Sequence, residues 1–510
     1  MTTDLSPAQA SARIETLLDA VESQALEFKR VSGKMVGKAL DTICAFANTE
    51  GGILVLGIAD PASASGKARL FGIEENPEAL DELSRKVTTQ FNPALARVQW
   101  WRLPCTLHDG KPGHVVLLRV EKSDAVHSIV DDGTWVRMGV SNREMTAAEI
   151  ADLHYRRGVR SATGEPVPVA LEMLDTDAWR RFVAARGLRA GTFPEQLQRI
   201  GLATKVGSEI QPMRAAVLLF ADEPGGLLAA HDTRADIRLM VYDGKAALPG
   251  ATPNLRKQPK TIRGPLIDQI DTAIKTVLDE LAQGLTLSGS GFEAKHVYPE
   301  RVVKEAIVNA VIHRDYRLNR DIFIRIFDDR IEIESPGVFP GSITPANVAR
   351  AGSKARNPLI AQNLREFPIA PNIDAGEGVK MMFAEMAAAQ LYPPQYSQNT
   401  ETAVESVTVT LLNLERPSVW NEVSAWIDQE GFIQNAKLCE IAKVDTLKAS
   451  KLLAGWREQG LLVALPGRGK RNMAYTKPAQ VDSPTEVGGV EPPRWWQRLF
   501  SRPSDNNPEN

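Results

Sequence analysis

Alternating apolar and polar residues predict β-strands in the second half of the chain. The stretches 321–327 (DIFIRIF) and 330–334 (RIEIE) alternate residue by residue around Asp328 and Asp329, which predicts a hairpin with one buried face. Continuous apolar runs are typical of strands that are buried on both faces. Such runs predict further strands at 53–58, 215–220 and 237–242.

Four other stretches are predicted to be helices, at 35–46, 177–186, 269–283 and 304–316. In the last of these, Glu305, Asn309 and His313 recur every four residues, so on a helix they share one face. The residues between them are mostly apolar. A polar stripe on a buried helix needs a partner, usually a metal, a phosphate or an activated water. The alternative is a core helix with a satisfied polar edge.

Two glycine-containing segments follow this polar stripe. Ser335-Pro-Gly337 comes directly after the predicted hairpin, and Gly376 and Gly378 precede a stretch that is predicted to be a helix. Two glycines before a helix N-terminus let backbone N–H groups approach a phosphate closely. One Gly-x-Gly alone is weak evidence, but helix, hairpin and two glycine segments in this order indicate a nucleotide site.

These segments resemble, over about 260–395, the ATP-binding fold shared by gyrase, heat-shock chaperones, histidine kinases and MutL (GHKL). The resemblance implies that Glu305 polarises the attacking water and that Asn309 holds Mg²⁺ against the phosphates of ATP. Ser335 stands where the family has an adenine-reading Asp, and a Ser hydrogen bond to adenine is weaker. Further cofactor-binding residues implied by the family are His313, Gly337, Gly376 and Gly378.

A finer resemblance comes from three short motifs, His313-Arg-Asp-Tyr316, Ser335-Pro-Gly337 and Arg356-Asn-Pro358. They resemble a compact variant of the GHKL fold in bacterial proteins that are often labelled RecG-like, and this adds Asn357 to the implied cofactor-binding residues. The resemblance supports nucleotide binding better than hydrolysis. The chain has no Gly-x-x-x-x-Gly-Lys-Ser/Thr loop, so the label does not imply helicase activity.

A second set of motifs lies near the start of the chain, at 22–30 (ESQALEFKR), 46–52 (FANTEGG) and 137–143 (RMGVSNR). Their order resembles that of Schlafen-type AlbA-like domains, which bind nucleic acid, and the resemblance covers about 15–150. Animal Schlafen proteins that cleave RNA use three acidic residues. By motif these fall on Glu22, Glu27 and Asp60.

Three carboxylates brought together would bind one or two divalent ions, with Mn²⁺ a candidate, and activate water for phosphodiester cleavage. The alternative is structural, with Glu27 paired to a neighbouring base and Asp60 capping a loop. Because bacterial relatives of this domain are mostly described as DNA-binding, we expect binding without cleavage. The candidate phosphate contacts are all basic: Lys29, Arg30, Lys34, Lys38, Arg137 and Arg143. A solvated charged face is the alternative for each.

Residues 417–478 have the pattern of a winged helix. A first helix carries Trp420 and Ile427, Asn435 caps a short second helix, and a third spans 446–459. On the third helix, Lys448 and Lys451 are expected to point outward, and Leu447, Leu452, Leu453 and Trp456 inward. Strands at 461–465 and 472–476 flank a basic tip with Arg468, Lys470 and Arg471. Helix–turn–helix plus a basic hairpin is a layout that reads DNA, and a protein-contact winged helix is the alternative.

Composition narrows the remaining function classes. The 510 residues carry a formal net charge of −3, so any nucleic acid must be met by local basic patches. Three cysteines without paired spacing argue against a disulfide framework and a zinc site. We find no signal-like segment and no apolar run of membrane-spanning length, so we expect a cytoplasmic protein with no membrane partner.

The predicted fold class is therefore α+β with several domains. We expect an AlbA-like domain over 1–160, a connecting α/β region over 161–260 that begins with a linker at 161–168, a compact GHKL module over 261–400, a winged helix over 401–478 and a disordered tail over 479–510. The function we expect is an ATP-binding regulator of transcription or of defence against foreign DNA. It would bind DNA, or RNA as a second choice, as a homo-oligomer. The alternatives are a metal-dependent nuclease and a dimerisation scaffold that has lost its nucleotide.

Overall fold

The computed structural model describes residues 7–32, 35–96, 98–231, 233–248, 253–288, 291–296, 298–352, 354–371, 377–400, 404–416, 419–465 and 473–478. The chain divides into two compact units. One comprises residues 1–154, 426–436 and 446–510, and the other comprises residues 155–425 and 437–445. No helix in the described part of the chain has the length and apolarity that crossing a membrane requires.

A four-stranded sheet lies at the centre of the N-terminal domain. Its order is β1 (Leu26–Lys29), β2 (Gly51–Leu56), β5 (Pro112–Glu121), β4 (Val98–Thr106), and β1–β2 is its parallel pair. Alternate residues of β2 enter two different cores, Leu54 and Leu56 on one face, Ile53 and Val55 on the other. Burial on both faces explains the continuous apolar run, so the strand predicted at 53–58 is confirmed with slightly shifted ends.

Helices cover both faces of this sheet. On one face lie α2 (Met35–Asn48) and α3 (Pro77–Thr89), and on the other lies α1 (Pro7–Leu18). The hairpin of β7 (Trp135–Met138) and β8 (Ser141–Glu144) packs beside α2. The domain also contains a short pair, β3 (Phe91–Asn92) with β6 (Ser128–Ile129), and α4 (Ala147–Arg156) follows it along the chain.

A six-stranded sheet organises the second unit. Its order is β12 (Lys260–Ile262), β11 (Ile237–Val241), β15 (Ile322–Ile326), β16 (Arg330–Pro336), β18 (Ser406–Leu412), β17 (Gln395–Asn399). The hairpin predicted at 321–334 is the antiparallel pair β15–β16, and the strand predicted at 237–242 is β11. Both predictions are confirmed. Two strands of the sheet, β11 and β18, come from outside the expected 261–400 module, one from each side of it in the sequence.

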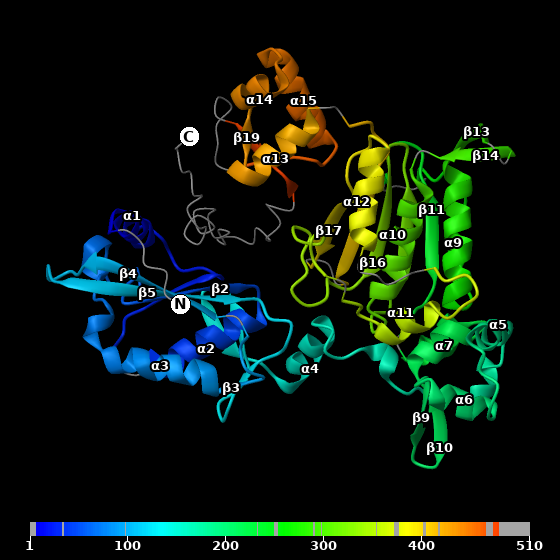
Figure 1. Ribbon diagram of the computed structural model, residues 1–510, viewed down its shortest axis with the longest axis horizontal. Coiled ribbons are helices and arrows are strands. Elements are labelled where there is room, and N and C mark those ends of the chain that lie inside the picture. Colours follow the sequence, from blue (N-terminus) through cyan, green and yellow to red (C-terminus); the bar gives the residue numbers. More distant parts are fainter. Residues whose placement is uncertain are drawn as a thin grey trace, which may run out of the picture. The chain divides into compact units, whose positions relative to one another are not determined.

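Three helices pack on one face of this sheet, as Figure 1 shows: α9 (Leu266–Leu281), α10 (Glu300–His313) and α12 (Gly378–Ala388). The core between them and the sheet contains Ile324, Ile333 and Leu411. The helices predicted at 269–283 and 304–316 are thus present. A hairpin that was not expected, β13 (Ala282–Ser288) with β14 (Gly291–His296), follows α9 directly.

Short helices beside this core correct one prediction. Residues 215–220, expected as a strand, form α7 (Arg214–Phe220), and every residue of it is buried. A short apolar run has the same pattern in a buried helix and in a buried strand, so the pattern alone could not decide. The neighbouring elements are α5 (Asp177–Arg186), α6 (Phe193–Arg199), β9 (Ala203–Val206), β10 (Glu209–Pro212), α8 (Pro224–Leu228) and α11 (Pro358–Leu364).

The elements of the C-terminal region follow the predicted order. They are α13 (Trp420–Glu430), β19 (Ile433–Gln434), α14 (Asn435–Ala442), α15 (Thr446–Glu458), β20 (Val463–Ala464) and β21 (Ala474–Thr476), and the three strands form one sheet. The Asn435 side chain donates to the Thr446 carbonyl and the Ser450 hydroxyl, and its role as a helix cap stays a prediction. One detail differs. Leu447, expected inward, is 69% exposed. The predicted tail 479–510 lies outside the described residues.

We predict that Asn48→Ala destabilises the N-terminal domain by about 2–4 kcal/mol, because three hydrogen bonds of a buried amide are lost. Asn48 ends α2, accepts from the His127 N–H at 2.8 Å, and donates to the carbonyls of His127 at 2.8 Å and Trp135 at 3.0 Å. Urea unfolding measures the change. The control is Gln99→Ala on β4, an exposed side chain, with an expected effect within about 0.5 kcal/mol. An equal effect of both variants would contradict the assignment.

Candidate functional site

The polar stripe of α10 lies as the sequence spacing predicted. Glu305, Asn309 and His313 are partly exposed on one face, while the residues between them are buried. The Asn309 Nδ2 donates to Glu305 Oε1 at 2.9 Å. The stripe is therefore a preformed carboxylate–amide pair with an imidazole at the end of the helix.

The N-terminus of a second helix, α12, contacts this pair. Gly378 is the first residue of α12, and a Cβ placed on it would lie 1.8 Å from Glu305 Oε1. Any larger residue at this position would therefore displace the end of the Glu305 side chain. The N-terminus of a helix carries a partial positive charge and free N–H groups, which favour carboxylates and phosphates. The predicted partner Gly376 lies outside the described residues.

Burial changes the protonation of Glu305. Loss of solvent raises the pKa of this carboxyl above its ordinary value, and the hydrogen bond from Asn309 and the charge of Arg301 oppose the shift only in part. A carboxyl group with a raised pKa is partly protonated nearer to neutral pH than an exposed one. Such tuning is common where a carboxylate handles a proton or a water.

Ser335 makes a different contact from the one expected. Its side chain is buried, and its hydroxyl donates to the Ala310 carbonyl of α10 at 2.7 Å. This bond uses the only hydrogen of the hydroxyl, and the oxygen keeps lone pairs that can accept a further hydrogen bond. Gly337 (φ +113°) brings the chain against Asp315, where a Cβ would lie 2.9 Å from the Asp315 Cβ. The Ser-Pro-Gly segment thus closes the core around the end of α10.

Asn357 caps the same end of α10. Its Nδ2 donates to the carbonyls of Ile312 and Arg314 at 2.8 and 2.7 Å. Its Oδ1 accepts from the hydroxyls of Ser161 and Thr163 at 3.2 and 3.4 Å. Asn357 thus satisfies carbonyls at the end of the helix, and its contact with a cofactor stays a prediction. The prediction of a linker at 161–168 is wrong, because Thr163 in this segment is fully buried.

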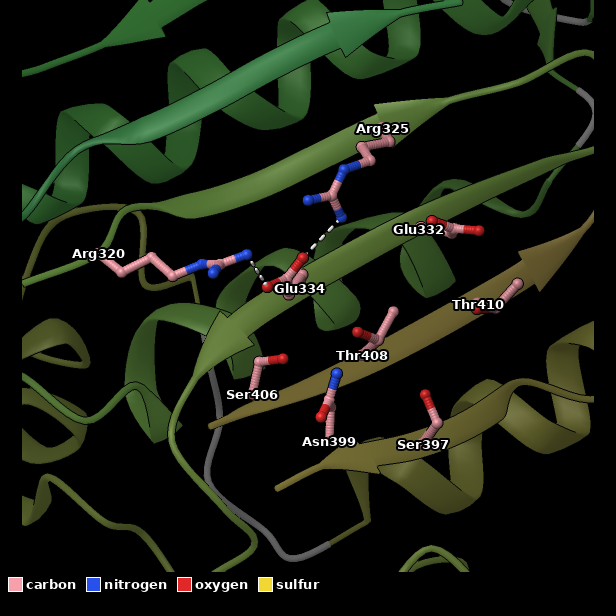
Figure 2. A pocket seen from close by; sticks show the side chains of 9 residues that line it. All are labelled: Arg320, Arg325, Glu332, Glu334, Ser397, Asn399, Ser406, Thr408 and Thr410. Carbon is pink, nitrogen blue, oxygen red and sulfur yellow. Dashed lines mark hydrogen bonds and ion pairs between the residues drawn. The ribbon is translucent and has the colours of Figure 1, made fainter. Parts of the chain in front are cut away.

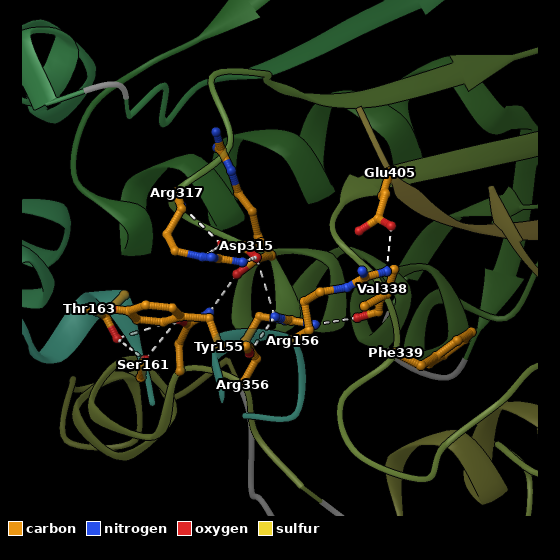
Figure 3. A network of polar contacts seen from close by, with 12 residues as sticks. Tyr155, Arg156, Ser161, Thr163, Asp315, Arg317, Val338, Phe339, Arg356 and Glu405 are labelled. Carbon is orange, nitrogen blue, oxygen red and sulfur yellow. Dashed lines mark hydrogen bonds and ion pairs between the residues drawn. The ribbon is translucent and has the colours of Figure 1, made fainter. Parts of the chain in front are cut away.

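A buried charge network surrounds this cap (Figure 3). Asp315 pairs with Arg317 at 2.6 Å and with Arg356 at 3.4 Å. Arg356 also donates to the carbonyls of Tyr155 and Val338 at 3.1 and 2.5 Å. Burial raises the pKa of Asp315, but the hydrogen bond from Arg317 and the charge of Arg356 outweigh it and hold the pKa below its ordinary value. The sequence motifs contained these residues without revealing their pairing.

The acidic residues of the N-terminal domain are held by protein partners. Glu27 Oε2 accepts from the buried Arg137 at 2.7 Å, and Glu27 Oε1 accepts from Lys29 at 2.6 Å. Asp60 accepts from the Ala62 N–H at 2.8 Å. The Arg137 side chain is 0% exposed and does not reach the surface. The prediction that it contacts a phosphate is therefore wrong. An arginine buried against a carboxylate serves the core instead.

Glu22 lies close enough to the other two acids to feel their charge. Burial is the main cause that raises its pKa, and the charges of Glu27 and Asp60 add to the shift. Even so, no group of three or more His, Cys, Asp or Glu side chains among the described residues is arranged to hold a metal ion. The divalent-ion site predicted from these three acids is not shown.

A basic depression of about 470 Å³ lies beside these acids. Lys29, Arg30 and Lys38 line it, together with Phe71 and Asp60. The Arg30 guanidinium lies 3.7 Å from the centre of the Phe71 ring and pairs with Glu75. Basic side chains beside an aromatic ring suit a phosphate with an attached base, although Lys29 and Arg30 each have a carboxylate partner here.

The other predicted basic contacts divide into two groups. Arg143 is exposed and pairs with Glu149 at 2.6 Å. On α15, Lys448 and Lys451 are exposed, as expected. The remaining basic candidates lie outside the described residues: Lys34, Arg468, Lys470 and Arg471.

Comparisons with known proteins agree with this geometry. Residues 22–146 match the family described as "Schlafen, AlbA_2", and residues 319–411 match the family described as "Putative ATP-dependent DNA helicase recG C-terminal". The chain carries a Schlafen-type AlbA-like domain and a RecG-like ATPase module. These two modules give it a function related to nucleotides and nucleic acids. The match to the RecG-like module begins after α10, so the roles of Glu305 and Asn309 rest on their geometry.

Other comparisons add little. No curated protein matches the chain. A crystal structure of the DIP2311 protein from Corynebacterium diphtheriae aligns over 92% of this chain and 97% of its own, at 20% identity and a TM-score of 0.38. A likeness of that size carries no argument about fold or function.

The α10–α12 contact fits one half of a nucleotide–Mg²⁺ complex. The Gly378 cradle and the Asn309 amide suit phosphates and a hard cation, and Glu305 is the carboxylate beside them. Ser335, the predicted adenine contact, donates its hydroxyl to α10, and its contact with adenine stays a prediction. The contact is therefore a candidate for the phosphate end of the RecG-like module's nucleotide site.

We predict that Glu305→Gln gains stability relative to wild type as the pH rises. With a raised pKa, folded Glu305 keeps its proton to a higher pH than unfolded Glu305, so the free energy of unfolding falls as pH rises between the two pKa values. Gln removes this loss, and below the ordinary pKa the advantage disappears. Urea unfolding at about pH 4 and about pH 8 measures it. The exposed Glu300→Gln on the same helix is the control, and equal pH profiles for both variants would contradict the prediction.

Proposed function

We propose that the chain is an ATP-binding, nucleic-acid-binding regulator in which bound nucleotide controls how nucleic-acid-binding modules are presented. The observation that carries this proposal is the contact between the Glu305–Asn309 pair and Gly378 at the start of α12. It joins two segments that the sequence separates widely, and both suit phosphate and Mg²⁺. The RecG-like family match supports the same module.

Each residue of the contact has a separate task in this proposal. Asn309 keeps its amide oxygen for Mg²⁺, because its nitrogen already donates to Glu305. Backbone N–H groups at the start of α12 face the phosphates. When bound, Mg²⁺ neutralises phosphate charge. Glu305 orients a water, and slow hydrolysis is expected because base recognition is loose. The module is thereby of the GHKL type.

The route from nucleotide to the rest of the chain runs through Arg356 and Asn357. Both lie in the segment 342–374, which we propose is ordered over the phosphates. Arg356 donates to the Tyr155 carbonyl, and Asn357 bonds the hydroxyls of Ser161 and Thr163. A change in this segment therefore reaches the residues that directly follow the AlbA-like domain in the chain. Loops ordered by phosphate contacts work this way in other nucleotide switches.

Two basic surfaces support nucleic-acid binding. One is the depression lined by Lys29, Arg30 and Lys38 in the AlbA-like domain. The other is α15, whose exposed Lys448 and Lys451 suit a recognition helix of a winged helix. DNA is the partner we favour over RNA, since such a helix suits a major groove. Control of transcription and defence against foreign DNA both fit, in a cytoplasmic homo-oligomer.

We predict that Asn309→Ala weakens ATP–Mg²⁺ binding by at least about tenfold, roughly 1.4 kcal/mol, because it removes a metal ligand and keeps the helix. Isothermal titration calorimetry on the full chain measures the affinity. Lys304→Ala, on the exposed face of the same helix, is the matched control and should bind as wild type does. Equal affinity in wild type and Asn309→Ala would rule out the assigned metal ligand.

We predict that the double variants Arg30→Ala/Lys38→Ala and Lys448→Ala/Lys451→Ala each weaken DNA binding and lower its log–log salt slope by about one unit per lost phosphate contact. Fluorescence anisotropy at several salt concentrations, with and without ATP, measures both quantities. Lys437→Ala on α14, which loses a surface pair with Glu440, is the control.

Three outcomes would each contradict part of the proposal. An unchanged salt slope in both double variants would remove these surfaces from the interface. Cleavage of nucleic acid that requires Mn²⁺ and is lost in Asp60→Ala would make the chain a nuclease, the rival function of Glu22, Glu27 and Asp60. Affinity for DNA that does not change with ATP would leave two binding modules without the nucleotide control.

A further inference from the structure

The face of the six-stranded sheet opposite α10 is polar and hollowed. Strand register places side chains on it in rows, because residues paired across strands point to the same face. One row joins Arg325, Glu332 and Thr410, and the next joins Glu334, Thr408 and Ser397. These side chains line a depression of about 360 Å³, with Arg320, Asn399 and Ser406 at its end.

Two arginines in this depression share one carboxylate. Glu334 pairs with Arg320 at 2.6 Å and with Arg325 at 2.7 Å, as Figure 2 shows. Each guanidinium also lies 5.2 Å from the centre of the Phe323 ring, which restricts where it points. A guanidinium has five N–H donors, so a single carboxylate leaves most of them for another acceptor. The cluster is a prearranged pair of cations with a net charge of +1.

The other side of the depression consists of hydroxyl groups. In Figure 2, Ser406 and Thr408 of β18 and Ser397 and Asn399 of β17 lie together beside Glu334. Within the described part of the chain, the hydroxyls of Ser397, Ser406 and Thr408, and that of Thr410, make no hydrogen bond to another protein group. Hydroxyls that both donate and accept match the hydroxyls of a sugar, which do the same.

We propose that this depression binds a small phosphorylated sugar, with its phosphate at Arg320 and Arg325 and its ring hydroxyls over Thr408 and Ser397. The size fits one such unit, since small-molecule sites begin at about 300 Å³. The two guanidinium groups suit one phosphate, because each has N–H donors beyond those that Glu334 accepts. A nucleic-acid strand needs several cations along its backbone. Glu332, which also lines the depression, pairs with Arg330 at 2.7 Å, and Arg330 pairs with Asp329 at 2.9 Å as well.

This site goes beyond the proposed nucleotide site and lies on the other face of the sheet. The two are joined by β16, in which Glu334 faces the depression and the next residue, Ser335, bonds to the Ala310 carbonyl of α10. A ligand that draws Arg320 and Arg325 away from Glu334 thereby acts on the strand that holds α10. The site is thus placed to modulate the RecG-like module without contact with its nucleotide.

Calorimetry of the full chain with ribose 5-phosphate, in EDTA so that Mg²⁺ is absent, tests the proposal. We expect binding that exceeds that of inorganic phosphate or ribose alone. Arg325→Gln should weaken it about tenfold, and Thr408→Val, which keeps shape and strand propensity, about threefold. Arg256→Gln, an exposed arginine that pairs with Asp243 and Asp328 outside the depression, should bind as wild type does.

Glu334→Gln separates a binding role from a structural one. It removes the competing carboxylate, so we expect tighter ribose 5-phosphate binding by at least about threefold, together with lower stability without ligand. Circular dichroism confirms that each variant is folded. Absence of binding, equal affinity in wild type, Arg325→Gln and Thr408→Val, or tighter binding of a single-stranded oligonucleotide than of ribose 5-phosphate would each overturn the proposal. Loss of binding in Asn309→Ala would place the ligand at the nucleotide site and overturn it too.

Discussion

The carbonyl groups at the end of α10 impose the constraint on which the RecG-like module depends. The helix ends inside the core, where an unpaired carbonyl is costly, and side chains must replace the missing turn. Asn357 serves two of these carbonyls and Ser335 a third. Both residues come from segments that follow in the sequence. Their attachment brings the Ser-Pro-Gly turn and the Arg-Asn-Pro motif to one place, so the motifs are near each other because the helix needs them.

The sequence predicted those elements whose apolar and polar residues recur at regular intervals. The stripe on α10, the β15–β16 hairpin and the buried strand β2 follow from repeats of four and two residues and from burial on both faces. The helix α7 was predicted as a strand, because a run of seven buried residues has no exposed polar positions whose spacing would distinguish a helix from a strand. The element order of the C-terminal region was also predictable, whereas Leu447 points outward at a position where an apolar residue was expected to be buried.

The candidate site could be predicted only in part, because residue type does not reveal a partner. The four-residue spacing identified Glu305 and Asn309, and the Gly-x-Gly pattern before a helix identified Gly378. The structure brings the three together. Ser335 and Asn357, which were predicted to bind a cofactor, donate to carbonyls at the end of α10, and no sequence feature predicted these bonds. The depression near Glu334 was missed: alternation predicted that Glu332 and Glu334 share one face, but no strand was predicted at 406–412, which supplies Thr408 and Thr410. The sequence feature that could have revealed it is the set of charged and hydroxyl side chains at alternate positions of β16 and β18.

The buried pair of Glu27 and Arg137 has a consequence for any alanine scan of the AlbA-like domain. Truncating Glu27 leaves a fully buried guanidinium without its counter-charge, which commonly costs about 3–5 kcal/mol. A loss of activity after that substitution would therefore look like the loss of a catalytic acid while reporting a damaged core. The exposed Asp60 carries no such ambiguity. In chains related to this one, positions 27 and 137 are expected to change together, and an isolated change at either is expected to be rare.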